Sequence, residues 1–264
     1  MYEEGVFLAD VGINNLSFPI RVPSRADPEG QHTIAEVSAY AHIMKEFRPR
    51  WMNKFMQVLH RDRRALGVAG MRVILEDLMQ ELRANKVTIR FDYPFFMEKT
   101  TPVTRERCLV KYSCSLEGWI TVTRDKPAVL FRMRIPVITS HPASVLGEPG
   151  GLLGQLTLVN VELQSDKPLY PEDVAELVES YAVSPVYSYL AEEDQEYIIN
   201  KIHSVFKPST ILIDRVKDRL ARNEDIEWYS VECRDYGIVN NYTILARVEK
   251  SRWIPFSSYI EETI

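Results

Sequence analysis

The chain has 264 residues, 45% of them hydrophobic and 26% charged, so it can bury an ordinary core and is not disordered. Its net charge of -5 and pI near 5.7 argue against a general nucleic-acid binder, which needs a basic face. No apolar run approaches the roughly 18 residues of a membrane span. The acidic start lacks the basic and apolar regions of a signal peptide, so we expect no membrane association.

The three cysteines, Cys108, Cys114 and Cys233, are widely spaced and form no CxxC pair. This pattern is typical neither of a disulfide framework nor of a zinc knuckle. We therefore expect free thiols in a reducing, cytoplasmic compartment. Cys108 and Cys114 lie in an expected strand and should be buried, whereas Cys233 precedes Arg234, a cation that could make its thiol more reactive.

The N-terminal part of the chain predicts one strand and two helices. Turn signals at 12–15 and a polar loop at 23–30 leave the first 31 residues without a clear period. Residues 32–43 are rich in small and β-branched side chains, which predicts a strand. Pro49 fits the first turn of an amphipathic helix, and a second such helix follows Gly70.

The middle of the chain, residues 86–161, is rich in β-forming residues, with breaks that carry Pro, Gly, Asp or Lys, as in an antiparallel meander. The expected strands are 87–91, 108–116, 119–123, 128–135 and 155–163. Helices return after Pro171, where Pro and two acids occupy the first turn. Further helices are expected at 194–206 and 209–221, and strands at 226–231 and 242–248.

The strands are grouped with one another rather than alternating with helices, which predicts an α+β fold with antiparallel sheets. Helices between strands occur twice along the chain, which indicates a duplicated module. We therefore expect one bimodular domain over residues 1–264, with approximate halves 1–125 and 126–264.

Several segments together carry a resemblance to a known family. They read VGINNLSFPI at 11–20, QHT at 31–33, FMEKTTPV at 96–103, and ELVE at 176–179 followed by SPVYSYL at 184–190. In this order they resemble the motifs of the type IB GTP cyclohydrolases and span most of the chain. The resemblance implies the tunnelling fold, antiparallel sheets with helices packed on one face. It also implies a small-molecule ligand and a homo-oligomer, a tetramer, with sites between subunits.

The departures from the family concentrate at its metal site. Positions that match a Cys, a His and a Glu ligand of the family hold His141, Leu153 and Gln195 here. Metal-assisted hydrolysis needs about three protein ligands and an open position, and a lone imidazole does not hold a divalent ion tightly. We therefore expect no metal and no other cofactor.

The family geometry would still bring together a pocket of polar side chains, with His141, Ser144, Gln155 and Gln195 as candidate catalytic residues. His141 could act as a general acid or base near neutral pH. Alternatively, it fills the Cys position and hydrogen-bonds nearby backbone. Ser140 is a poor partner for His141, because adjacent residues on a strand point to opposite faces.

The candidate substrate-binding residues are His32, Arg50, Lys54, Glu98 and Asp214. Arg50 and Lys54 could bind phosphates at a helix N-terminus, or belong to a solvated basic turn. Glu98 matches a family motif, but an exposed ion pair explains it as well, and His32 could line the pocket or cap its strand. Whether Asp214 is the carboxylate that anchors a purine in this fold stays open.

Three hypotheses follow. The chain is a repurposed, metal-independent enzyme acting on a different small molecule, possibly purine- or pterin-like, through groups such as His141. Alternatively, it is a non-catalytic binding or regulatory paralogue, as apolar Leu152 and Leu153 in the former ligand loop suggest. The third hypothesis is an active GTP cyclohydrolase with an altered metal site.

Overall fold

The computed structural model describes residues 8–44, 50–61, 66–123, 125–142, 153–237 and 241–251. The strands are β1 (Leu8–Val22), β2 (Gln31–Met44), β3 (Ala84–Thr100), β4 (Arg107–Thr121), β5 (Ala128–Ser140), β6 (Gly154–Ser165), β7 (Ser184–Pro185), β8 (Ile226–Tyr236) and β9 (Thr243–Glu249). The helices are α1 (Trp51–Arg61), α2 (Val68–Glu81), α3 (Pro171–Tyr181), α4 (Glu192–Ser204) and α5 (Ser209–Ala221).

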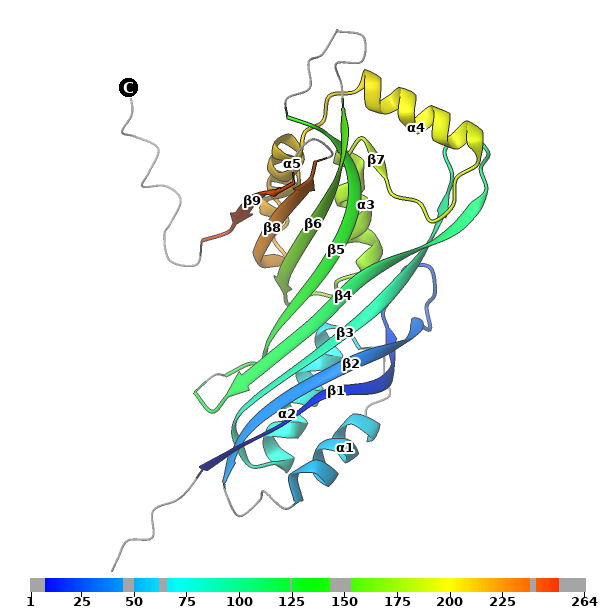
Figure 1. The fold of residues 1–264 in the computed structure, drawn as a ribbon. Coiled ribbons are helices and arrows are strands. Elements are labelled where there is room, and N and C mark those ends of the chain that lie inside the picture. Colours follow the sequence, from blue (N-terminus) through cyan, green and yellow to red (C-terminus); the bar gives the residue numbers. More distant parts are fainter. Residues whose placement is uncertain are drawn as a thin grey trace, which may run out of the picture.

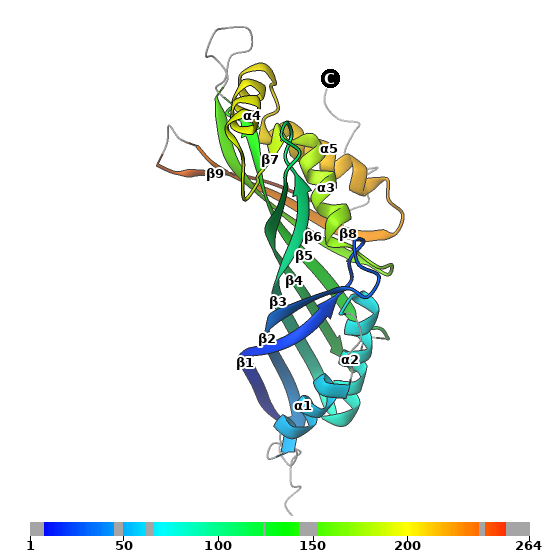
Figure 2. The same ribbon diagram turned by 90° about the vertical axis from the view of Figure 1, so that its right-hand side faces the viewer.

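The strands form one long antiparallel sheet in the order β1-β2-β3-β4-β5-β6-β8-β9, with the short β7 paired to β5 (Figure 1). Turning the molecule shows α1, α2, α3 and α5 on one face of this sheet (Figure 2). The predicted α+β fold with antiparallel strands and helices on one face is therefore confirmed. None of the described helices is long and apolar enough to cross a membrane.

The chain passes through two similar series of elements. Two long strands, a pair of helices and two more strands run from β1 to β4. From β5 to β9 the chain again forms two strands, a helical region and two strands, with the short β7 and a third helix added. Figure 1 shows α1 and α2 packed on the strands of the first series, and α3 and α5 on those of the second.

The first strand is the main element that the sequence pattern missed. The turn signals at 12–15 mark a bulge inside β1, because the pairing with β2 shifts between Ile13 and Leu16 and Asn15 adopts a positive φ of 58°. Asn tolerates this left-handed conformation better than most residues do. The same residues therefore read as a turn in the sequence and form a bulge in the sheet.

The sequence also predicts a break in the meander near Gly118, and the structure has none there. The expected strands 108–116 and 119–123 form the single strand β4, which continues through Gly118. A Cβ at Gly118 would lie 2.6 Å from Leu75 Cδ1 and 2.8 Å from Met71 Cγ of α2. Gly118 thus allows the helix to pack closely on the sheet and does not form a turn.

All three cysteines are free and buried, as predicted for Cys108 and Cys114. Cys233 is not made reactive by the cation next to it, because burial raises the pKa of its thiol to about 12. The neighbouring Arg234 pairs with Glu232, with Nε and Oε1 2.6 Å apart.

This burial predicts slow thiol chemistry. At pH 8 a thiol-disulfide reagent should modify Cys233 about 1,000-fold more slowly in the native protein than in the unfolded protein, because the thiolate is the reacting form. Absorbance of the released thiol, followed with and without denaturant, measures this ratio. Rapid labelling of Cys233 in the native protein would contradict the prediction.

Candidate functional site

The first candidate cluster lies where β5 and β6 end side by side, with Ser140 opposite Gly154. The His141 backbone N–H donates to Leu153 O at 2.7 Å, so the pairing extends one residue beyond the strands. His141 and Gln155 are 7% and 3% exposed. A Cβ built on Gly237 would lie 3.7 Å from the His141 ring and 4.0 Å from Gln155 Oε1. The structure thus brings His141 and Gln155 together beside a residue that has no side chain.

A buried chain of hydrogen bonds crosses three strands behind Gln155. Its Nε2 donates to Thr139 Oγ1 at 3.3 Å, the hydroxyls of Thr139 and Thr157 are 2.7 Å apart, and Thr157 donates to Asp235 Oδ1 at 2.6 Å. Ser209 donates to the other carboxylate oxygen, Asp235 Oδ2, at 2.5 Å. These five residues, named here the Asp235 relay, are all buried.

The hydrogen bonds of the Asp235 relay from Gln155 through Thr139 and Thr157 all donate towards Asp235. A carboxylate only accepts hydrogen bonds, so the Thr157 proton points to Asp235 and the Thr157 oxygen accepts from Thr139. The Thr139 oxygen then accepts from the Gln155 amide nitrogen. This places Gln155 Oε1 on the opposite side, where it is buried and has no hydrogen-bond partner among the described residues. The relay therefore fixes the direction of the Gln155 amide and leaves Oε1 as an unused acceptor in the described part of the chain.

Ser140 belongs to a different set of contacts. Its hydroxyl donates to Val205 O at 2.9 Å and accepts from Lys207 N at 2.9 Å. These bonds tie the end of β5 to the segment between α4 and α5. Ser140 therefore bonds to this segment and does not act as a proton partner of His141, as the alternation of side chains along a strand predicts.

Gln195 lies on the exposed surface of α4, and its Nε2 donates to Leu190 O at 3.1 Å. The same helix meets β6 through Ile202, whose Cγ2 would lie 2.9 Å from a Cβ at Gly154. Seven residues of helix separate these positions, a rise of about 10 Å. Within a single chain Gln195 therefore does not lie beside Gln155. The fourth candidate catalytic residue, Ser144, lies outside the described residues.

The residue before Gln195 has a structural role. Burial raises the pKa of the Asp194 carboxyl, but hydrogen bonds from the Thr104 hydroxyl (2.6 Å) and from the amides of Val103, Thr104 and Ala191 outweigh it and lower the pKa to about 2. The ionised carboxylate thus fixes the start of α4 to the loop between β3 and β4.

This pKa predicts an acid-sensitive contribution to stability. Because the pKa is lower in the folded than in the unfolded chain, the contribution is complete above about pH 4 and is lost as the pH falls towards about 2. The melting temperature of Asp194→Asn should lie below that of the unmodified protein at pH 6, and the gap should close towards pH 2. Glu193→Gln, an exposed neighbour, is the control and should show no such gap.

A hollow of about 640 Å³, separate from the His141–Gln155 cluster, brings two other candidates together. His32 at the start of β2 and Glu98 near the end of β3 both line it, and so does Glu172 in the first turn of α3. Glu98 is exposed and pairs with Arg107 at 3.3 Å. We name this feature the Glu172 hollow.

The other candidates lie apart from these clusters. Arg50 is exposed at the start of α1, and Lys54 Nζ donates to Glu81 O at 2.8 Å at the end of α2. Asp214 lies on α5 with its side chain 68% exposed, 3.5 Å from Lys217 Nζ. In Figure 1, α1 lies at the opposite end of the molecule from the β5–β6 ends. One chain therefore does not join Arg50 and Lys54 to His141.

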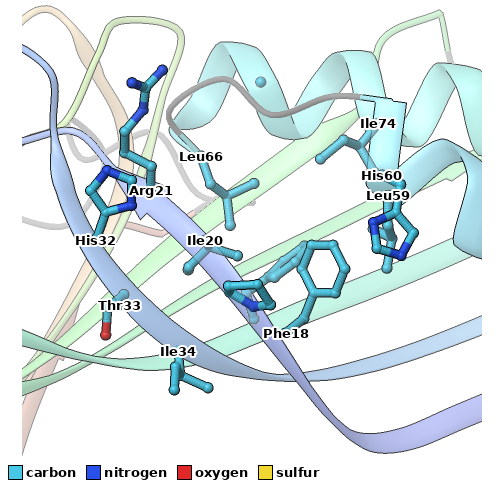
Figure 3. Close-up of a pocket in the computed structure, with 13 residues that line it drawn as sticks. Phe18, Ile20, Arg21, His32, Thr33, Ile34, Leu59, His60, Leu66 and Ile74 are labelled. Atoms are coloured by element: carbon cyan, nitrogen blue, oxygen red, sulfur yellow. The ribbon is translucent and has the colours of Figure 1, made fainter.

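Another pocket, of about 910 Å³, lies between the first two helices and strands β1, β2 and β3. Figure 3 shows Arg21 and His32 together at one end and His60 beside Phe18 at the other. The Phe18 and His60 ring centroids are 5.2 Å apart. Sequence reasoning singled out only His32 here, although Phe18 falls within the family-like segment 11–20.

The side chains at the matched positions do not form a set of metal ligands. The described part of the chain contains no group of three or more His, Cys, Asp or Glu side chains arranged to hold a metal ion. Leu153, at the position matched to a His ligand, offers no donor atom and is 37% exposed. The described residues at this end of the sheet therefore do not fit a metal ion.

Comparisons with known proteins agree with this fold. Urate oxidase from Bacillus sp. TB-90 superposes with a TM-score of 0.55 at 9% identity, over 95% of this chain and 99% of that one, and so shares the tunnelling fold. The protein named GTP cyclohydrolase FolE2 of Pelobacter propionicus is 28% identical over 93% of this chain and 94% of its own length. The FolE2 of Nitratidesulfovibrio vulgaris is 30% identical, over 91% and 90%.

The family model for type I GTP cyclohydrolase FolE2 matches residues 3–246, nearly the whole chain. The match spans β1 to β8 and part of β9, including both candidate clusters. This chain therefore belongs to the type I GTP cyclohydrolase FolE2 family.

Proposed function

We propose that this chain is a FolE2-family enzyme that acts on a purine- or pterin-like small molecule without a bound metal ion. The observation that carries this proposal is that buried His141 and the oriented acceptor Gln155 Oε1 both lie beside Gly237. By resemblance, His141 stands where the family holds a metal-binding Cys. An enzyme with a changed reaction would keep polar groups at such a position. A protein that has lost catalysis would not require the Asp235 relay that orients Gln155.

The two side chains have complementary roles. The His141 imidazole can take or give a proton near neutral pH, as ring opening or hydration of a heterocycle requires. Gln155 Oε1 accepts a hydrogen bond from a ring N–H or amino group of the ligand and so orients it. The donor set at the matched ligand positions, with Leu153 and the exposed Gln195, supports a reaction that uses no metal ion.

We further propose that the active form is a homo-oligomer, a tetramer by resemblance, with its sites between subunits. Arg50 and Lys54 lie at the opposite end of the chain from His141, so they could join the site only from a second copy. The exposed edge strands β1 and β9 leave backbone groups that a neighbouring sheet can pair with. The free, buried cysteines support a reducing, cytoplasmic setting.

The test is turnover of a panel of purine and pterin compounds, GTP included, with a metal chelator present. We expect chelator-resistant turnover of at least one compound and a loss of 100-fold or more in His141→Ala. His42→Ala is the matched control, because His42 is a histidine on the surface of β2, bonded to Asp10 at 2.9 Å, and should retain full activity. Equal turnover in His141→Ala would overturn the proposal.

Two other outcomes identify the alternatives. Fluorescent pterin formed from GTP only with stoichiometric zinc or manganese would establish an active cyclohydrolase with an altered metal site. Tight binding without any turnover would favour the non-catalytic paralogue, which the apolar Leu153 at a matched ligand position supports.

A further inference from the structure

The Glu172 hollow lies where the two series of elements meet. One wall is the loop between β1 and β2, the second is the end of β3, and the third is the first turn of α3. Its volume of about 640 Å³ is in the range of small-molecule sites. None of its walls contains His141 or Gln155, so a ligand bound here would occupy a different site from the one proposed above.

Hydrogen bonds hold these walls in place without a ligand. The Gln31 side chain makes two bonds with the Phe96 backbone, accepting from N at 2.8 Å and donating to O at 2.7 Å. Ser24 Oγ and the Arg25 backbone N–H both donate to Glu172 Oε1, at 2.5 and 2.8 Å. The hollow is therefore preformed, which lowers the entropic cost of binding.

Glu172 has an unused acceptor atom. The residue is 8% exposed, and while Oε1 accepts both bonds from the β1–β2 loop, Oε2 is buried and has no partner within the described residues. Leaving a buried charged acceptor without a donor is costly. A donor supplied by a ligand would recover that free energy.

The charges around this oxygen select the type of donor. Five carboxylates line the hollow against one arginine, Arg25, which is bound to one of the five, Asp173. The Arg25 guanidinium makes a bidentate pair with Asp173, the closest contact 2.7 Å, and lies 3.9 Å from the Tyr170 ring centroid. A predominantly acidic hollow attracts cations.

We propose that the Glu172 hollow binds a small organic cation, an amine or guanidine compound whose N–H group donates to Glu172 Oε2. Charge-assisted N–H···O bonds of this kind are among the stronger hydrogen bonds in proteins. A bare metal ion fits less well, because the described residues contain no group of three suitable ligands. Glu176, an exposed carboxylate at the rim, can pair with a second positive group on the same molecule.

The test uses agmatine, which carries a guanidinium and an ammonium group, and N-butylurea as a neutral analogue. Calorimetry should show saturable binding of one agmatine per chain, weakened by added salt, and no binding of N-butylurea. Glu172→Gln should weaken agmatine binding by 10-fold or more. This variant keeps an oxygen for the bonds from Ser24 and Arg25, so the wall stays in place.

The control is Glu224→Gln, which makes the same change of charge at an exposed position after α5 and should bind agmatine within twofold of the unmodified protein. Melting curves confirm that both variants are folded. The proposal is overturned if the unmodified protein shows no saturable agmatine binding. Equal affinities of the Glu172→Gln and Glu224→Gln variants would overturn it as well.

Discussion

Replacing Glu179 by Ala should lower the free energy of unfolding by about 3–5 kcal/mol. Glu179 on α3 forms an ion pair with Lys99 at the end of β3, and their side chains are only 7% and 12% exposed. Tyr112 O–H also donates to Glu179 Oε1 at 2.6 Å, and burial, with the nearby Glu179, raises the Tyr112 pKa well above its usual range. The substitution leaves a buried ammonium and a buried hydroxyl without their acceptor.

Chemical denaturation measures this loss as a lower midpoint with an unchanged slope. Glu98, which precedes Lys99 in the sequence, provides the control. It pairs with Arg107 on the surface, so Glu98→Ala should lower the free energy of unfolding by no more than about 1 kcal/mol. A second variant tests the mechanism. Lys99→Met combined with Glu179→Leu removes both charges and should be much more stable than Glu179→Ala alone. Equal losses in Glu179→Ala and Glu98→Ala would refute the buried-pair interpretation.

Lys99 and Glu179 also show what sequence reasoning could and could not reach. Both fall within family-like segments, 96–103 and 176–179, so the sequence marked them as related to the family. It gave no sign that they meet, because their contact depends on how α3 packs against β3 and β4. Part of the resemblance therefore reflects how the fold is held together.

Element types were predictable wherever the hydrophobic period was clear, as in α5, whose bounds 209–221 match the expectation. The predicted strand boundaries were wrong where a residue type that is common in turns has another structural role. Asn15 forms a bulge where a turn was expected, and Gly118 accommodates α2 inside a continuous strand. Local sequence does not distinguish these uses, since the packing partner decides between them.

The candidate site was predicted only in part. The resemblance placed His141 and Gln155 together, and the structure shows them adjacent. The Asp235 relay was missed because it depends on strand register, with Thr139 opposite Gln155 and Thr157 opposite Asp235. The available signal was the set of polar residues at alternate positions in otherwise apolar strands.

Replacing Asp235 by Ala should lower the free energy of unfolding by about 2–5 kcal/mol, because the Thr157 and Ser209 hydroxyls both lose a buried acceptor. It should also release the orientation of Gln155. Without a carboxylate to fix the Thr157 proton, the relay can reverse and the Gln155 amide can turn its nitrogen towards the His141 side.

Two single-hydroxyl variants separate stability from orientation. Ser209→Ala and Thr157→Val each remove one bond to Asp235, so both should unfold at lower denaturant concentration. Only Thr157→Val interrupts the path to Gln155, so only this variant should also impair turnover of the substrate identified for His141. Neutron diffraction can locate the Gln155 deuterons directly, and we expect them on the Thr139 side in the unmodified protein and in Ser209→Ala. If Ser209→Ala impaired turnover as much as Thr157→Val did, Asp235 would act through stability alone and not by positioning Gln155.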